Sequence, residues 1–227
     1  MSPLIIAIDG PAASGKSTVS RKLAERLGYV HVESGAVYRA LTWQLIRDGL
    51  AGAAAETIVR HLSKVTLHFF MEHGRLRFTV NAADPEPAIR SLAVQEFVSA
   101  VAAIPEARAW VNGHLRGLRR FGNLVMEGRD IGTVVFPQAT FKFYLDAEPQ
   151  ERARRRQREQ QFSSQDLTAS AEVERALLRR DESDQSRPTA PLALAPGAYR
   201  IETTHLSVED VIERILAIIS SGRNVCV

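Results

Sequence analysis

The chain of 227 residues contains one cysteine, Cys226, next to its C-terminus. A single cysteine excludes an intrachain disulfide, so the sequence carries no sign of the disulfide framework of small secreted proteins. No stretch approaches the roughly 20 consecutive apolar residues that a membrane-spanning helix needs. No signal peptide is recognisable, since the apolar N-terminal run leads directly into a glycine-containing loop. We therefore expect a cytoplasmic protein that makes no membrane contacts.

Lysine is scarce as well. Of the 29 basic residues only four are lysine and the other 25 are arginine, which against 26 acidic residues leaves a net charge of +3. Arginine has a planar fork of donors that matches phosphate and carboxylate oxygens. A genomic preference for arginine codons explains the total equally well. It explains less well why arginines gather at 152–158 and at 175–187.

A glycine-bounded loop near the N-terminus separates a predicted strand from a predicted helix. Residues 10–17 (GPAASGKS) fit the phosphate-loop pattern G-x-x-x-x-G-K-[ST]. The apolar run 4–8 before the loop is typical of a buried strand, and Val19, Leu23 and Leu27 after it form one helical stripe. These flanks make a chance match in a flexible loop a poor alternative. The loop therefore predicts phosphate binding at a helix N-terminus, with Lys16 near the β- and γ-phosphates and the Ser17 hydroxyl on Mg²⁺.

The rest of the chain alternates predicted strands and helices, which indicates an α/β fold with a parallel sheet of about five strands. Strands are predicted at 4–8, 29–32, 123–127, 141–145 and 199–202. Helices are predicted at 16–27, 36–48, 150–160, 171–184 and 208–220, with a pair of helices within 91–121. Ser207 with Asp210 three residues later resembles a capping box for the last helix.

One segment interrupts this alternation. Two short apolar runs at 65–70 and 75–80 flank His73-Gly74, which predicts a β-hairpin. We expect the hairpin to belong to a subdomain inserted at 51–118 into a three-layer α/β/α core formed by 1–50 and 119–227, with a short helical lid at about 150–168.

Polar residues follow two of the predicted strands, where parallel sheets bind ligands. Ser34 and Arg39 follow the second strand, although taken alone they are better explained as a plain helix cap and a solvated arginine. Arg129 and Asp130 follow the next core strand between two glycines. Arg129 could clamp a phosphate and Asp130 could accept from an amino group. A structural ion pair in a turn is the alternative.

The segment 152–158 holds five arginines in seven residues. They cannot all lie on one face of a helix, and they repel one another unless anions are present. One interpretation is a lid that closes over phosphates and neutralises charge during transfer. A solvated surface helix and a nucleic-acid-binding patch remain alternatives. The arginines and carboxylates of 180–187 could likewise be plain ion pairs on a helix.

These motifs together resemble the bacterial-type cytidylate kinases over nearly the whole chain. The most specific match is residues 128–137 (GRDIGTVVFP), and 8–18 and 34–39 resemble that family's phosphate loop and its first nucleotide-monophosphate segment. The hairpin insert, the arginine-rich lid, the run from Arg180 to Arg187 and residues 203–207 (TTHLS) also fit. The sequence departs from the family pattern at several positions: Glu33, Glu127, Asp84-Pro85-Glu86 and Leu115-Arg116.

The resemblance implies transfer of the γ-phosphoryl group of ATP to CMP and dCMP, with Mg²⁺ held through Ser17. It implies catalytic roles for Lys16, Arg129, Asp130, Arg155 and Arg156. It places ATP on Gly10, Pro11, Ala12, Ala13, Ser14, Gly15, Lys16, Ser17, Thr18 and Arg152. It places CMP in the inserted nucleotide-monophosphate subdomain and against Ser34, Arg39, Ser99, Arg108, Arg129, Asp130, Arg180, Asp184 and Arg187.

Two rival functions remain open on the sequence alone. One is another small-molecule kinase, acting on UMP, AMP or shikimate. The other is a P-loop nucleic-acid-dependent ATPase that uses the arginine run, although the guanine-reading Asn-Lys-x-Asp and an apolar strand ending in Asp-Glu are both missing. We expect a monomer that binds nucleotides and no nucleic acid.

Overall fold

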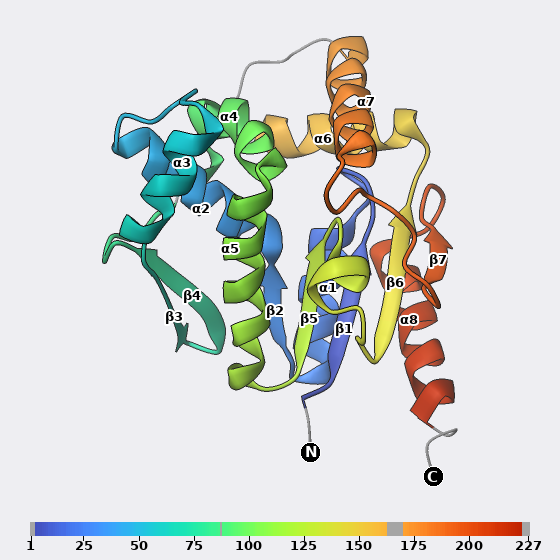
Figure 1. Cartoon of the computed structure of the whole chain (residues 1–227). Helices are drawn as coiled ribbons and strands as arrows, with labels where there is room; N and C mark the ends of the chain where they lie inside the picture. Colours follow the sequence, from blue (N-terminus) through green and yellow to red (C-terminus); the bar gives the residue numbers. More distant parts are fainter. Residues whose placement is uncertain (1–2, 87, 163–169, 224–227) are drawn as a thin grey trace. The chain divides into compact units, whose positions relative to one another are not determined.

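The computed structural model describes residues 3–86, 88–162 and 170–223 (Figure 1). The chain divides into two compact units. One unit comprises Val30–Leu124 with the first residues of the chain, and the other comprises Leu4–Tyr29 and Val125–Val227. Within the described residues, no helix is both long enough and apolar enough to cross a membrane.

The central sheet has five strands in the order β2-β5-β1-β6-β7. These are β1 (Ile5–Asp9), β2 (Val30–Glu33), β5 (Leu124–Gly128), β6 (Phe141–Asp146) and β7 (Tyr199–Glu202). Strand β6 runs parallel to β1, with Ile6 opposite Phe141, and parallel to β7, with Phe143 opposite Tyr199. The predictions of an α/β fold and of a five-stranded parallel sheet are confirmed. All residues of β1 and β5 are buried, as expected for inner strands of such a sheet.

The core of the second unit lies where two helices pack against the sheet. Helix α1 (Lys16–Leu27) contributes Val19 and Leu23, and α8 (Val208–Arg223) contributes four branched residues, Val211, Ile212, Ile215 and Ile219, to one cluster with side chains of β1, β5, β6 and β7. The predicted capping box begins α8, because the Asp210 N–H donates to Ser207 Oγ (3.1 Å) and the Ser207 N–H donates to Asp210 Oδ2 (3.1 Å). The burial of apolar side chains therefore fixes α1, and with it the end of the phosphate loop, on the sheet.

Two further helices of this unit, α6 (Pro149–Phe162) and α7 (Ser170–Ser186), lie beside each other (Figure 1). Ala153 of α6 and Val173 and Leu177 of α7 form a small apolar cluster with Ala12. The predicted lid at 150–168 therefore corresponds in its first part to α6. Residues 163–168 lie outside the described residues.

The first unit is mostly helical. It contains α2 (Ser34–Arg47), α3 (Ala55–His61), α4 (Leu92–Ala103) and α5 (Pro105–Gly117), with short 3₁₀ turns at Leu62–Lys64, Ala88–Arg90 and Leu118–Phe121. Helix α3 was not predicted. The pair α4 and α5 was predicted, and it begins at Ser91, whose hydroxyl accepts from the Val94 N–H (3.5 Å).

The predicted β-hairpin belongs to this unit. Strands β3 (Leu67–Glu72) and β4 (Arg75–Val80) are antiparallel, and Glu72 pairs with Arg75 across the turn. His73 and Gly74 both have positive φ, as a two-residue hairpin turn requires. The first strand ends two residues later than predicted, because pairing extends to the turn itself.

Candidate active site

The phosphate loop has a tightly constrained backbone. Gly10 has φ +147°, and a Cβ added there would lie 2.0 Å from the Leu145 carbonyl oxygen of β6. Gly15 has φ +90° and precedes the first residue of α1. Both positions require glycine, since an L side chain would be strained at either and would overlap the sheet at Gly10. The loop therefore ends at an α-helix N-terminus, whose N–H groups favour an anion.

Lys16 is buried at the start of α1, where its ammonium donates to the Pro11 carbonyl oxygen (2.5 Å). Burial, together with the positive charge of Arg129, lowers the pKa of Lys16 to about 7, although Glu127, Asp9 and Asp181 favour the charged form. A phosphate bound in the loop would restore the charge balance. The ammonium is thus placed as a phosphate ligand is expected to be, and it is poised between two protonation states.

Ser17, which follows Lys16, donates its hydroxyl to Glu127 Oε2 (2.8 Å) at the end of β5. A hydroxyl and a carboxylate at the phosphate loop are the hard oxygen donors that Mg²⁺ prefers, and Mg²⁺ usually takes only one or two ligands from the protein and completes its shell with phosphates and water. The residues therefore fit the metal. Glu127 was not predicted as a site residue.

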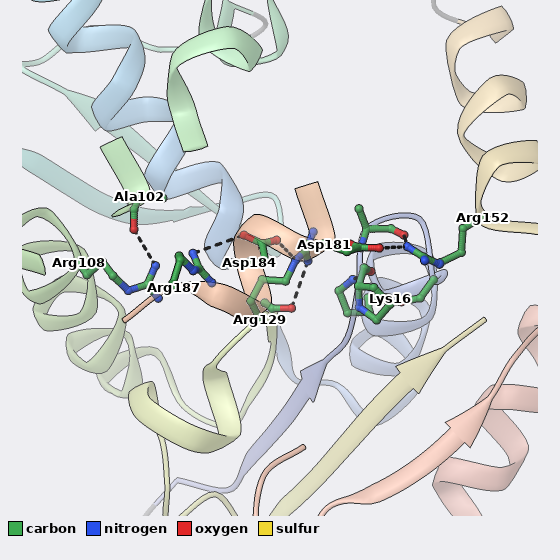
Figure 2. Close-up of polar contacts among 12 residues, drawn as sticks. Lys16, Ala102, Arg108, Arg129, Arg152, Asp181, Asp184 and Arg187 are labelled. Atoms are coloured by element: carbon green, nitrogen blue, oxygen red, sulfur yellow. Dashed lines mark hydrogen bonds and ion pairs between the residues drawn. The ribbon is translucent and has the colours of Figure 1, made fainter. Parts of the chain in front are cut away.

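Arginines of the 152–158 run make specific contacts within the second unit. Arg152 is buried and forms an ion pair with Asp181 of α7, and it also donates to the Ala12 carbonyl oxygen (3.3 Å) (Figure 2). Asp181 accepts from the Ala12 N–H (3.2 Å). A carboxylate therefore holds one amide of the phosphate loop. Asp181 was likewise not predicted as a site residue.

Arg155 lies one turn further along α6. It donates to the Thr203 carbonyl oxygen (2.7 Å) and hydroxyl (3.1 Å) and to Glu151 Oε1 (3.1 Å). The Thr203 hydroxyl in turn lies 3.2 Å from the Ser14 carbonyl oxygen of the phosphate loop. Arg156 pairs with Glu159 (3.2 Å). Arg155 is therefore fixed beside the loop.

Two of the expected acceptor-binding arginines share one carboxylate. Arg129 donates through Nε to Asp184 Oδ2 (3.0 Å), and Arg187 pairs with Asp184 Oδ1 (3.5 Å) (Figure 2). Two guanidinium groups on one carboxylate leave an excess positive charge suited to a phosphate. Arg180 also belongs to α7, but its side chain lies outside the described residues.

Asp130 follows Arg129 and begins a π-helical turn, η4 (Ile131–Val135), which was not predicted. Asp130 is buried with an exposed fraction of 4%. The amides of Ile131 and Gly132 donate to Asp9, the last residue of β1, at 2.8 and 2.7 Å. The segment that carries Arg129 and Asp130 is therefore bonded to the strand that leads into the phosphate loop.

The remaining expected site residues, Ser34, Arg39, Ser99 and Arg108, belong to the first unit. Arg39 and Arg90 both pair with Glu33 at the end of β2, Arg90 at 3.0 Å. Burial raises the pKa of Glu33, but these two arginines outweigh it and hold the pKa below its ordinary value. Ser34 is buried at the first position of α2, five residues before Arg39.

Arg108 of α5 is buried, with its guanidinium 5.3 Å from the centre of the Tyr38 ring and Nη1 donating to the Ala102 carbonyl oxygen (3.0 Å). That carbonyl lies near the end of α4, the helix that also carries the exposed Ser99. Contacts with Ala102 of α4 and Tyr38 of α2 therefore hold the Arg108 side chain in one orientation.

Two acidic residues of the site could have been predicted from the sequence, because each lies at the end of an apolar strand. Asp9 and Glu127 both occupy such positions. Asp181 and Thr203 carry no comparable signal, because their contacts with the phosphate loop join segments far apart in the chain.

The fold and the loop define a P-loop α/β protein, and a solved structure of an uncharacterized protein from Eubacterium ventriosum shares the fold (TM-score 0.54, 11% identity, 96% of this chain and 99% of that chain). The family model for cytidylate kinase matches residues 6–221. A cytidylate kinase from Geobacillus kaustophilus is 43% identical over 95% of this chain and 96% of that protein, and one from Geobacter sulfurreducens is 39% identical over 95% and 92%. The chain therefore belongs to the cytidylate kinase family, as its motifs predicted.

Proposed function

We propose that this protein transfers the γ-phosphoryl group of ATP to CMP, and also to dCMP, to give ADP and CDP or dCDP. The observation that carries the proposal is the arrangement within the second unit. A buried phosphate-loop lysine lies close enough to the Arg129 guanidinium for that charge to lower its pKa, and Arg129 shares Asp184 with Arg187. Donor and acceptor phosphates thus have neighbouring positive groups of their own.

Catalysis by these groups is mainly positioning and electrostatic stabilisation. Lys16 and the loop amides bind the β- and γ-phosphates of ATP, while Arg155 and Arg156 neutralise charge from the side of α6. Mg²⁺ would be held by the Ser17 hydroxyl, which Glu127 orients by accepting its hydrogen bond, and would supply further positive charge to the phosphates. Arg152 reaches the donor phosphates once they replace Asp181 at the loop.

The phosphate of CMP binds Arg39, Arg129 and Arg187, and its ribose binds Arg180 and Asp184. Ser99, Arg108 and Asp130 read cytosine, with Ser34 at the start of α2. Asp130 accepts from the exocyclic amino group, which uracil replaces with an oxygen that has no proton to share. The segment 51–118, which contains the hairpin, serves as the nucleotide-monophosphate subdomain, and the protein acts as a monomer.

The contacts of the arginine run support the lid over the nucleic-acid patch. Arg152 is buried against Asp181, and Arg155 is bound to Thr203 and Glu151 beside the phosphate loop, so neither belongs to an exposed surface that a nucleic-acid strand could cover. Arg154 and Arg158 are exposed, but two side chains make a small patch.

A coupled assay of ADP release with ATP and each of CMP, dCMP, UMP, AMP and shikimate tests the proposal. We expect kcat/KM for CMP to exceed that for UMP by at least about tenfold, or about 1.4 kcal/mol. Comparable rates with CMP and UMP would favour a kinase of broader pyrimidine specificity. ATP hydrolysis that needs DNA or RNA would overturn the proposal.

A further inference from the structure

Asp9 ends strand β1 and immediately precedes the phosphate loop. Its side chain is buried, with 3% exposed. Each carboxylate oxygen accepts one backbone N–H, Oδ1 from Ile131 at 2.8 Å and Oδ2 from Gly132 at 2.7 Å. Both donors begin η4, directly after Arg129 and Asp130. One side chain therefore joins the two segments that carry the phosphate loop and the proposed acceptor site.

The backbone of η4 explains why these two amides need an acceptor. Within the turn, the Val134 and Val135 amides donate to the Asp130 carbonyl (2.9 and 3.1 Å), and the Phe136 amide donates to the Ile131 carbonyl (2.7 Å). The first amides of any helical turn have no partner within it. Asp9 satisfies two of them, so Asp130 is held from one side by its own carbonyl and from the other by the peptides that follow it.

Gly132 lies in close contact with its surroundings. A Cβ added at Gly132 would lie 3.2 Å from Ala195 Cβ, 3.4 Å from Asp9 Oδ2 and 3.4 Å from Lys142 Cδ. Glycine at 132 therefore avoids a tight contact with Ala195 while its peptide N–H bonds to the carboxylate.

The charges around Asp9 are unusual for a purely structural bond. Burial and the negative charge of Asp130 raise its pKa to about 6, while the two amides and Lys16 oppose this rise. A buried carboxylate beside a second carboxylate is unfavourable, and a neutral side chain could fill the same volume at a lower cost. A carboxylate, however, offers one oxygen acceptor to each of the Ile131 and Gly132 amides, which a neutral side chain of the same shape cannot do.

We infer that Asp9 is a positioning residue for the acceptor nucleotide: by anchoring the Ile131 and Gly132 amides it holds Asp130 and Arg129 in register with the phosphate loop, and cytosine selectivity depends on it. The inference rests on the proposed function, because it assigns Asp9 an effect on the groups that read CMP. It predicts that a change at Asp9, which is not among the residues proposed to bind CMP, weakens the preference for CMP over UMP.

Asp9→Asn tests this with the smallest change of shape. Asparagine has one oxygen acceptor, and its amino group would face the second backbone N–H, so one of the two bonds is replaced by a contact between donors. We expect kcat/KM for CMP to fall at least tenfold and the CMP-to-UMP ratio to narrow by a factor of at least three. The Kd for CMP, measured by calorimetry without ATP, should rise in the same proportion as the KM.

Asp210→Asn is the matched control. Asp210 also accepts a backbone N–H, from Ser207 at 3.1 Å, but it lies at the start of α8. It should leave the CMP-to-UMP ratio unchanged. A double-mutant cycle with Asp130→Ala separates positioning from general weakening: if Asp9 acts through Asp130, Asp9→Asn should change the ratio by less than twofold once Asp130 is absent.

The inference is overturned if Asp9→Asn lowers activity on CMP and UMP equally, or if the two changes are additive. Should Asp9→Asn fail to fold, Gly132→Ala adds a methyl group 3.2 Å from Ala195 Cβ, which displaces the Gly132 peptide from Asp9 and must narrow the CMP-to-UMP ratio. An unchanged ratio in a folded Gly132→Ala protein would equally overturn the inference. A wild-type protein with no CMP preference would instead refute the proposed function, which is a separate result.

Discussion

Lys16 should take up a proton when ATP binds. In the ligand-free protein its pKa is lowered to about 7, chiefly by burial and then by the charge of Arg129. Bound phosphates add several negative charges at its ammonium and remove the reason for the low pKa. The lysine of the complex should therefore be fully protonated at neutral pH.

The size of the uptake follows from the two pKa values. A group with a pKa of about 7 is about one-tenth neutral at pH 6, about half neutral at pH 7 and about nine-tenths neutral at pH 8. If binding restores an ordinary lysine pKa, ATP binding should take up about 0.1, 0.5 and 0.9 protons at these three pH values. The lowered pKa also affects folding. In the unfolded chain Lys16 has its ordinary pKa of 10.5, so between pH 7 and pH 10.5 the unfolded chain binds more protons than the folded protein. The contribution of Lys16 to the free energy of unfolding therefore increases as pH rises from about 7 toward 10.5.

Calorimetric titration with MgATP in buffers of different ionisation enthalpy measures the protons directly. Lys16→Arg is the control. Because arginine stays charged at every pH used, this variant should take up no protons at this position when ATP binds. If that variant does not bind, the wild-type Kd for ATP should still weaken by nearly tenfold between pH 8 and pH 9. Binding at pH 8 with no proton uptake and no weakening above it would refute the assigned environment of Lys16.

Three further changes probe the site. Arg129→Lys removes the fork that reaches Asp184, so we expect the KM for CMP to rise at least about tenfold and the KM for ATP to change less than about threefold; equal rises in steady-state kinetics would indicate a structural ion pair. Arg155→Ala should lower kcat without nucleic acid present and raise proteolysis of α6 in the nucleotide-bound protein, whereas unchanged turnover would refute the lid. Gly10→Ala places a methyl group 2.0 Å from the Leu145 carbonyl, so urea unfolding should show a loss of about 3 kcal/mol or more, and normal stability would contradict the loop geometry.

The inner strands β1 and β5 were predictable because burial on both faces leaves apolar runs that stand out from their surroundings. Helix α3 was not, since its seven residues bury only Ile58 and show little periodicity. The π-helical turn η4 was also missed. Its shape depends on Asp9, a residue from a strand far away in sequence, which a local pattern cannot reveal.

The same distinction holds at the site. Lys16 and Ser17 belong to a contiguous motif whose local backbone determines what it binds. The partners that orient the arginines do not. Asp181 could be taken for an ion-pair residue on α7, and only the structure shows its contact with the Ala12 amide and Arg152. Thr203 is one of many hydroxyl residues in the chain, and its contact with Arg155 arises from the pairing of β6 with β7.

The strand order has a consequence for the biosynthesis of the protein. Strand β1 pairs with β6, so Ile6 can pair with Phe141 only after about 140 residues have been synthesised. The phosphate loop likewise contacts Leu145 and Thr203, which are synthesised later still. Pairings of such long sequence separation slow folding. A nascent chain released at residue 50 contains the whole phosphate-loop motif but none of these neighbours. We expect such a fragment to be unable to bind nucleotide, and the ribosome to finish most of the chain before the first-made motif becomes a binding site.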